Sequence, residues 1–152
     1  KTHSEGRHPR MDHLGRAVLL INGVLFVKMG AEYLRGSLSG DGISPTSLPT
    51  IAKLPNSEFR LGVGMIIPFT GCAYLAVGST NLLAAALFGN KEAGVTLGLT
   101  GLWCHLAMAV ARLQLPRDVT EVYTPGAISK VNKTQFGLGA LSLGCSATLL
   151  LG

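Results

Sequence analysis

The pattern of apolar and polar positions divides the chain into four long apolar runs separated by polar segments. The clearest run covers residues 61–89 and contains no charged side chain. A helix rises about 1.5 Å per residue, so about 20 residues cross a hydrocarbon core roughly 30 Å thick. This run is long enough to span a bilayer, and we therefore predict that the chain is an integral membrane protein.

The four runs predict an all-α fold, a small polytopic membrane protein with three to four transmembrane helices. The predicted spans are about 14–36, 60–89, 94–115 and 136–152. Pro68 should kink the second helix, because proline removes a backbone hydrogen bond and clashes with the preceding turn. The segment 37–58 is rich in Ser, Gly and Pro, and the segment 116–135 is polar. Both are expected to be mostly irregular.

Residues 14–152 are expected to form a single transmembrane helical domain that follows a polar tail, residues 1–13. The tail carries His3, His8 and His13, and this five-residue spacing is not that of a compact metal site, so no metal is expected. The chain begins at Lys1 rather than Met. This suggests a processed N-terminus, such as the product of transit-peptide removal in an organelle.

Charge is scarce and evenly spread. Only 14% of the 152 residues are charged, against about 25% in ordinary soluble domains. The net charge of +5 suits contact with anionic lipid headgroups better than nucleic-acid binding, which needs a clustered basic face. The arginines near the predicted span ends should reach the headgroups. They are Arg16, Arg35, Arg60 and Arg112.

Small residues predict close helix packing. Most of the 20 glycines lie within the apolar runs. Gly94 and Gly98 form a GxxxG spacing at the start of the third span. A second set lies three and four residues apart on one face of the fourth span: Gly137, Ala140, Gly144 and Ala147. Such faces let the backbone of another helix approach closely, either within this chain or in another subunit.

Three ionisable residues within the spans could carry chemistry. Lys28 and Glu32 are one helical turn apart and can form an ion pair, either near the headgroups or at a functional site. His105 lies in the middle of the third span. It could bond a neighbouring polar group, ligate the metal of a haem or a pigment, or take part in catalysis. No cofactor is required by the sequence, and bound lipids are expected.

Common catalytic motifs are missing from the sequence. It contains no hydrolase elbow, P-loop, HExxH, paired zinc ligands or GxGxxG fingerprint. The segments that carry a resemblance are GRAVLLINGVLFVKMG and YLAVGSTNLLAAALFG. In their general residue pattern they are similar to small four-helix bacterial membrane proteins of the DoxX type. They contain no diagnostic motif, and we take no family assignment from them.

Few acid–base groups and several packing faces predict a non-catalytic accessory subunit of a larger organellar membrane complex. A respiratory-chain or ATP-synthase complex of the mitochondrial inner membrane is the first expectation, and a thylakoid photosystem the second. The alternative is a small lipid- or isoprenoid-handling enzyme or transporter. That alternative requires Lys28, Glu32 and His105 to meet in one cavity between helices.

Overall fold

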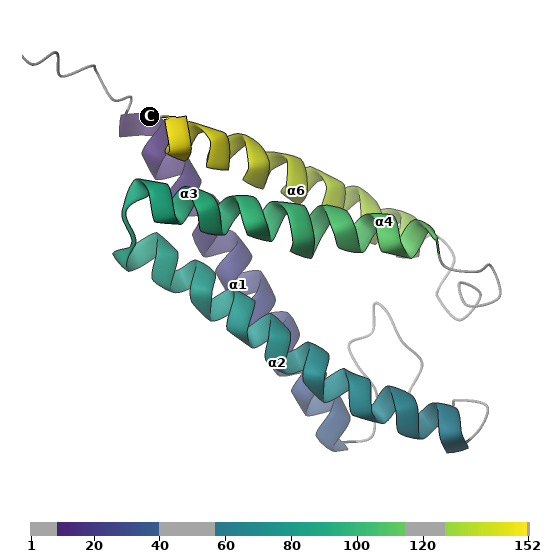
Figure 1. Ribbon diagram of the computed structural model, residues 1–152. Helices are drawn as coiled ribbons and strands as arrows, with labels where there is room; N and C mark the ends of the chain where they lie inside the picture. The colour runs from purple at the N-terminus through teal and green to yellow at the C-terminus, as the bar shows by residue number, and fades with distance from the viewer. Residues whose placement is uncertain (1–8, 40–56, 115–126, 152) are drawn as a thin grey trace, which may run out of the picture.

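The protein is an all-helical bundle in the computed structural model, which describes residues 9–39, 57–114 and 127–151. Helix α1 covers Pro9–Ser39 and α2 covers Ser57–Leu87. The third span consists of α3 (Asn90–Leu99), the π-helical segment η2 (Thr100–Ala107) and α4 (Met108–Leu113). Helix α6 covers Ala127–Leu151. Figure 1 shows α1 crossing α2, and α6 lying beside the continuous third span.

Four helices are long and apolar enough to cross a membrane, which confirms the predicted fold class. The candidate spans are His13–Arg35, Pro68–Leu87, Asn90–Ala111 and Ser129–Leu151. Large apolar side chains cover much of the outer surface, as expected where the surrounding solvent is lipid. The protein is therefore an integral membrane protein.

The fourth helix begins earlier than predicted. We expected irregular structure throughout 116–135 and a span from residue 136, but α6 already begins at Ala127. The stretch from Ala127 to Gln135 contains no Gly or Pro to break a helix. Its polar residues divide between two faces, with Asn132 buried and Lys133 exposed, so polarity there reflects a helix with two environments.

The helices of the other spans also begin earlier in the sequence than predicted. Helix α1 begins at Pro9, within the segment predicted as a tail, because proline is well tolerated in the first turn of a helix. Helix α3 begins at Asn90, four residues before the predicted start of the third span. Residues 37–39 and 57–58 were predicted to be irregular but belong to α1 and α2. The remaining parts of the predicted irregular segments, residues 40–56 and 116–126, lie outside the described residues.

Pro68 lies inside α2, and the helix is continuous from Ser57 to Leu87. The proline therefore does not interrupt the helix, and a kink at this position stays a prediction. About five turns further on, the chain reverses direction between Leu87 and Asn90, so α2 and α3 form an antiparallel hairpin (Figure 1).

Helices α1 and α2 approach each other through glycines. A Cβ added to Gly30 would lie 2.7 Å from the backbone oxygen of Gly71. A Cβ added to Gly78 would lie 2.7 Å from the backbone nitrogen of Val27 and 2.9 Å from the oxygen of Gly23. Real Cβ atoms do not come this close, so the two backbones can touch only because side chains are missing at these positions.

Glycines also bring the third span onto α6. A Cβ on Gly94 would lie 3.0 Å from Leu150, and one on Gly98 would lie 2.7 Å from the Ser146 hydroxyl. Further along, a Cβ on Gly101 would lie 3.1 Å from the Gly139 oxygen. Gly94 and Gly98, the predicted GxxxG pair, therefore face α6, and Gly101 continues this contact in η2.

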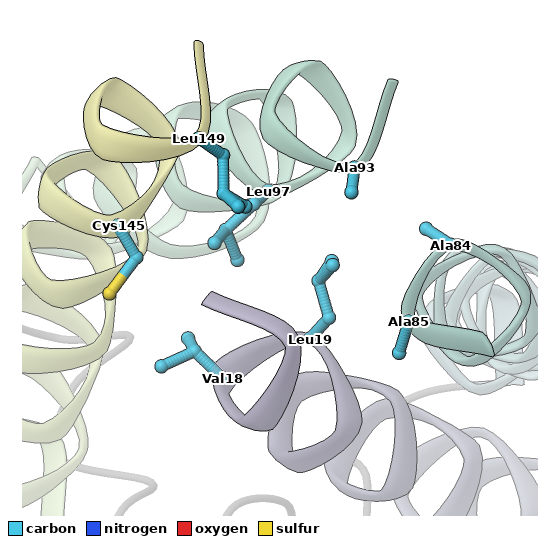
Figure 2. Close-up of a cluster of buried hydrophobic side chains, with 8 residues drawn as sticks. All are labelled: Val18, Leu19, Ala84, Ala85, Ala93, Leu97, Cys145 and Leu149. Carbon is cyan, nitrogen blue, oxygen red and sulfur yellow. The ribbon is translucent and has the colours of Figure 1, made fainter. Parts of the chain in front are cut away.

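An apolar cluster joins all four spans near the α2–α3 turn. Its members are Val18, Leu19, Ala84, Ala85, Ala93, Leu97, Cys145 and Leu149. Figure 2 shows these side chains converging from α1, α2, α3 and α6. Three of the eight are alanines, which allows the helices to converge at this end of the bundle. Outside this cluster the interior also contains buried polar side chains, among them Asn22, Asn81 and His105.

Candidate functional site

The strongest candidate for a site is a chain of polar side chains buried in the middle of the bundle. It joins α1, η2 and α6 through Asn22, His105, Gln135 and Ser142. His105 and Ser142 are completely inaccessible, and so is Asn22. Buried polar groups in lipid require partners, since water cannot replace a missing hydrogen bond there.

His105 uses both of its ring nitrogens. Nδ1 lies 2.7 Å from Gln135 Oε1, and Nε2 lies 3.1 Å from Asn22 Oδ1. The Asn22 amide in turn donates from Nδ2 to the Ser142 hydroxyl at 3.0 Å. The histidine therefore links α6 to α1, and every ring nitrogen already has a polar neighbour.

The two neighbours of the His105 ring are both amide oxygens, Gln135 Oε1 and Asn22 Oδ1. A neutral imidazole carries one N–H and can donate to only one of them, so which nitrogen donates depends on the tautomer. In either tautomer the ring lies between one amide of α6 and one of α1.

Aromatic rings cover one side of the histidine. The Phe26 ring stacks on His105 with centroids 5.3 Å apart, and it stacks on Tyr74 at 5.5 Å. Tyr74 meets Tyr33 edge-on at 5.4 Å. The rings come from α1 and α2, so these two helices close the histidine off from lipid on that side and hold its plane.

His105 also lies in a π-helical segment, η2. A π-turn carries an extra residue and often occurs at functional positions, because it changes the direction of neighbouring side chains. Thr100, Gly101 and His105 are the buried residues of this segment. Thr100 pairs with the Asn81 amide of α2 at 3.0 Å, so the same segment reaches α2 as well as α1 and α6.

Lys28 and Glu32 form the predicted pair but do not join the histidine. Lys28 Nζ lies 3.9 Å from Glu32 Oε1, with side chains 72% and 39% exposed. The ring nitrogens of His105 are held by Asn22 and Gln135 instead. The three residues required by the enzyme alternative are thus not brought into one hydrogen-bonded group.

Among the residues the structure describes, no group of three or more His, Cys, Asp or Glu side chains is placed to hold a metal ion. A pigment or haem metal at His105 would have to displace Asn22 or Gln135 from a ring nitrogen, because an imidazole nitrogen cannot bind both at once. Both ring nitrogens of His105 are thus already next to amide oxygens of this chain.

The predicted headgroup arginines behave differently from one another. Arg16 donates to the backbone oxygens of Ala85 at 2.8 Å and Phe88 at 3.0 Å, and to Asn90 Oδ1 at 3.1 Å. It therefore binds the carbonyl groups at the end of α2, where the helix dipole favours a cation. Arg35 is exposed, and the side chains of Arg60 and Arg112 lie outside the described part of the chain.

The small residues predicted on the fourth helix point away from the bundle. A Cβ added to Gly137 or Gly144 meets nothing within 4 Å, and Ala140 and Ala147 are exposed. The opposite face of α6 makes the internal contacts through Gln135, Gly139 and Ser142. The stripe is not used by the described helices of this chain, and any partner for it comes from outside them.

Sequence reasoning missed the Gln135 amide and the glycines of the α1–α2 contact. Gln135 was assigned to a loop, although it lies seven residues before Ser142 on the same helical face. Gly23 and Gly30 in α1, and Gly71 and Gly78 in α2, are each seven residues apart. This repeated spacing is a signal that could have revealed the α1–α2 contact.

Comparison of the chain with protein-family models found no match, and comparisons with curated proteins and with solved structures also found none.

Proposed function

We propose that this chain is a non-catalytic helical subunit that packs into a larger membrane assembly. The observation that carries the proposal is the outer face of α6, where Gly137 and Gly144 leave open space next to Ala140 and Ala147. In lipid, helices associate where small residues let backbones approach, because apolar area alone gives no advantage over lipid tails. This face suits a transmembrane helix of another subunit.

The interior supports the same role. His105 has both ring nitrogens occupied, and its partners Asn22 and Gln135 are uncharged amides. General acid–base chemistry needs a titratable group that can reach a substrate. A histidine locked between two amides and covered by Phe26 is better suited to fixing the helices.

The alternative, a lipid- or isoprenoid-handling enzyme or transporter, receives less support from these contacts. It needs Lys28, Glu32 and His105 around one substrate, whereas Lys28 is largely exposed. Substituting Glu32→Gln and His105→Ala separately, and measuring both assembly and any lipid conversion or transfer, distinguishes the two proposals. Loss of lipid turnover with intact assembly would favour the alternative.

The finer location, an energy-converting membrane of an organelle, rests on the sequence alone. Its support is the charge-poor, glycine-rich composition and the scarcity of acid–base groups. Subcellular fractionation of the source cells tests it, with the mitochondrial inner membrane as the first expected fraction and the thylakoid as the second. Recovery only in another membrane would contradict this location without affecting the packing role.

The decisive experiment is native electrophoresis in a mild detergent, with identification of the co-migrating chains. The wild-type chain should migrate within a larger complex, and Gly144→Leu should release it because the added side chain fills the open face of α6. Ala86→Leu adds similar bulk at an exposed position on α2 and serves as the control. If all three forms migrate as a free chain of 15.9 kDa in its micelle, the proposal is wrong.

A further inference from the structure

One buried amide near the beginning of α6 has no partner among the described residues. Asn132 is 5% exposed, and neither its Nδ2 nor its Oδ1 has a hydrogen-bond partner there. A primary amide offers two donors and one acceptor oxygen. Burying such a group without partners is costly, and most of all in lipid, so an unpaired amide indicates that something else satisfies it.

The helix face that carries Asn132 is built for hydrogen bonding. Four buried polar residues follow one another on this face of α6: Asn132, Gln135, Ser142 and Ser146. Gln135 bonds His105, Ser142 bonds Asn22, and the Ser146 hydroxyl donates to the Gly94 oxygen at 2.6 Å. Asn132 alone of the four is unpaired, although it lies only one turn from Gln135.

The position of Asn132 indicates where its ligand comes from. It lies five residues after Ala127, the first residue of α6, and the charged side chains of Lys130 and Lys133 beside it are exposed. Lysines near the end of a transmembrane helix extend to the headgroups, where water and the polar parts of lipids meet the hydrocarbon. Asn132 therefore lies at the polar end of α6, and Lys133 and Thr134 lie on other faces of the helix.

The chemistry of the site selects a neutral ligand. Asn132, Gln135 and Ser142 carry no charge, and the nearest members of this polar face bond to other uncharged side chains or to His105. A charged ligand buried here would lack a counter-charge among these side chains. A hydroxyl group fits instead, because one hydroxyl can accept from the amide N–H and donate to the amide oxygen.

We propose that the Asn132 side chain binds a hydroxyl group at the edge of the membrane, supplied either by a water molecule or by the alcohol head of a lipid. This site extends the polar face of α6 by one turn toward the membrane surface. Binding at Asn132 needs no protein partner. Its test is therefore independent of the proposed role of the chain in a larger assembly.

Nuclear magnetic resonance on the full-length protein tests the site directly. The chain is labelled with [15N]asparagine and placed in nanodiscs of deuterated phosphatidylcholine that contain protonated dioleoylglycerol. The side-chain amide protons of Asn132 should show a nuclear Overhauser cross-peak to water or to the dioleoylglycerol headgroup. Asn132→Gln keeps an amide but removes the label, so the resonance that disappears is that of Asn132.

Thermal unfolding separates the two sources. If a lipid alcohol binds, raising the dioleoylglycerol fraction raises the Tm of the wild type, because a ligand that binds the folded state stabilises it. Asn132→Leu should abolish this rise, and Thr134→Val, which removes an exposed hydroxyl two residues away, should retain it. If water binds, the water cross-peak is present and the Tm does not depend on dioleoylglycerol. An Asn132 amide with neither cross-peak overturns the proposal.

Discussion

The two interfaces that α1 makes inside the bundle are held together in different ways. Along most of its contact with α2 the fit is steric, and backbone atoms meet where Gly23, Gly30, Gly71 and Gly78 lack side chains. Against η2 and α6 the contact is directional, because Asn22 Oδ1 lies at His105 Nε2 and Asn22 Nδ2 donates to the Ser142 hydroxyl. Both kinds of contact can hold helices together in a membrane. Burial of apolar side chains alone cannot, because lipid tails compete for the same apolar surfaces.

The two interfaces should therefore fail differently. Where Gly23, Gly30, Gly71 and Gly78 meet, the glycine interface leaves no room for added atoms. The polar interface can accept modest changes of shape, but each removed side chain leaves another buried group unpaired. Some substitutions add bulk at a glycine, and others remove a hydrogen-bonding side chain. Comparing them separates the contributions of the two interfaces to stability.

The largest effect is expected from His105→Leu. Leucine retains most of the volume but leaves Asn22 and Gln135 without their ring-nitrogen partner, and each orphaned buried group costs about 1–3 kcal/mol. Unfolding in mixed detergent micelles should show the loss. Trp103→Leu is the control on the same segment, because Trp103 is 61% exposed and its loss should change stability little. Equal stability of the two variants would mean that the polar interface contributes nothing.

Gly78→Ala should come next. The new Cβ would lie 2.7 Å from the Val27 nitrogen, which is a backbone atom and can move only with α1. Overpacking of this kind costs about 1–3 kcal/mol. Gly144→Ala is the matched control, since an added Cβ there meets nothing within 4 Å. The same unfolding measurement should leave the control unchanged, and a comparable loss in both would argue against a tight α1–α2 contact.

A smaller effect is expected for the coupling between Asn22 and Ser142. A double-mutant cycle with Asn22→Ala and Ser142→Ala should give an interaction energy of about 0.6 kcal/mol, the average for hydrogen bonds between transmembrane helices. The parallel cycle of Asn22 with Thr100, which is bonded to Asn81 instead, should give none. Coupling of the same size in both cycles would show that the network is not specific.

The smallest effect is expected at the surface. Glu32→Gln removes the charge that faces Lys28, but exposed pairs one turn apart contribute only about 0.3–0.5 kcal/mol. Stability should therefore remain close to that of the wild type, and increasing salt should remove the difference. A loss larger than that of Gly78→Ala would show that this pair belongs to the interior.

Part of the candidate site could be predicted from the sequence. His105 was identified because an imidazole in an apolar run needs a partner. Gln135 was assigned to a loop, since the helical period was sought among apolar residues while α6 begins with polar ones. The partners of His105 lie 30 and 83 residues away along the chain, and no local pattern encodes such a pairing.

Length and apolarity, compared with the hydrocarbon thickness, were enough to predict three to four spans in a membrane, because these are properties of each segment alone. Which face of each helix is internal depends on the folded bundle. Gly94 and Gly98 face α6, whereas Gly137 and Gly144 face outward, although small residues mark both helices. In lipid an apolar face gains little by being internal, so the orientation of each helix is set by hydrogen bonds and close contacts between residues far apart in the sequence.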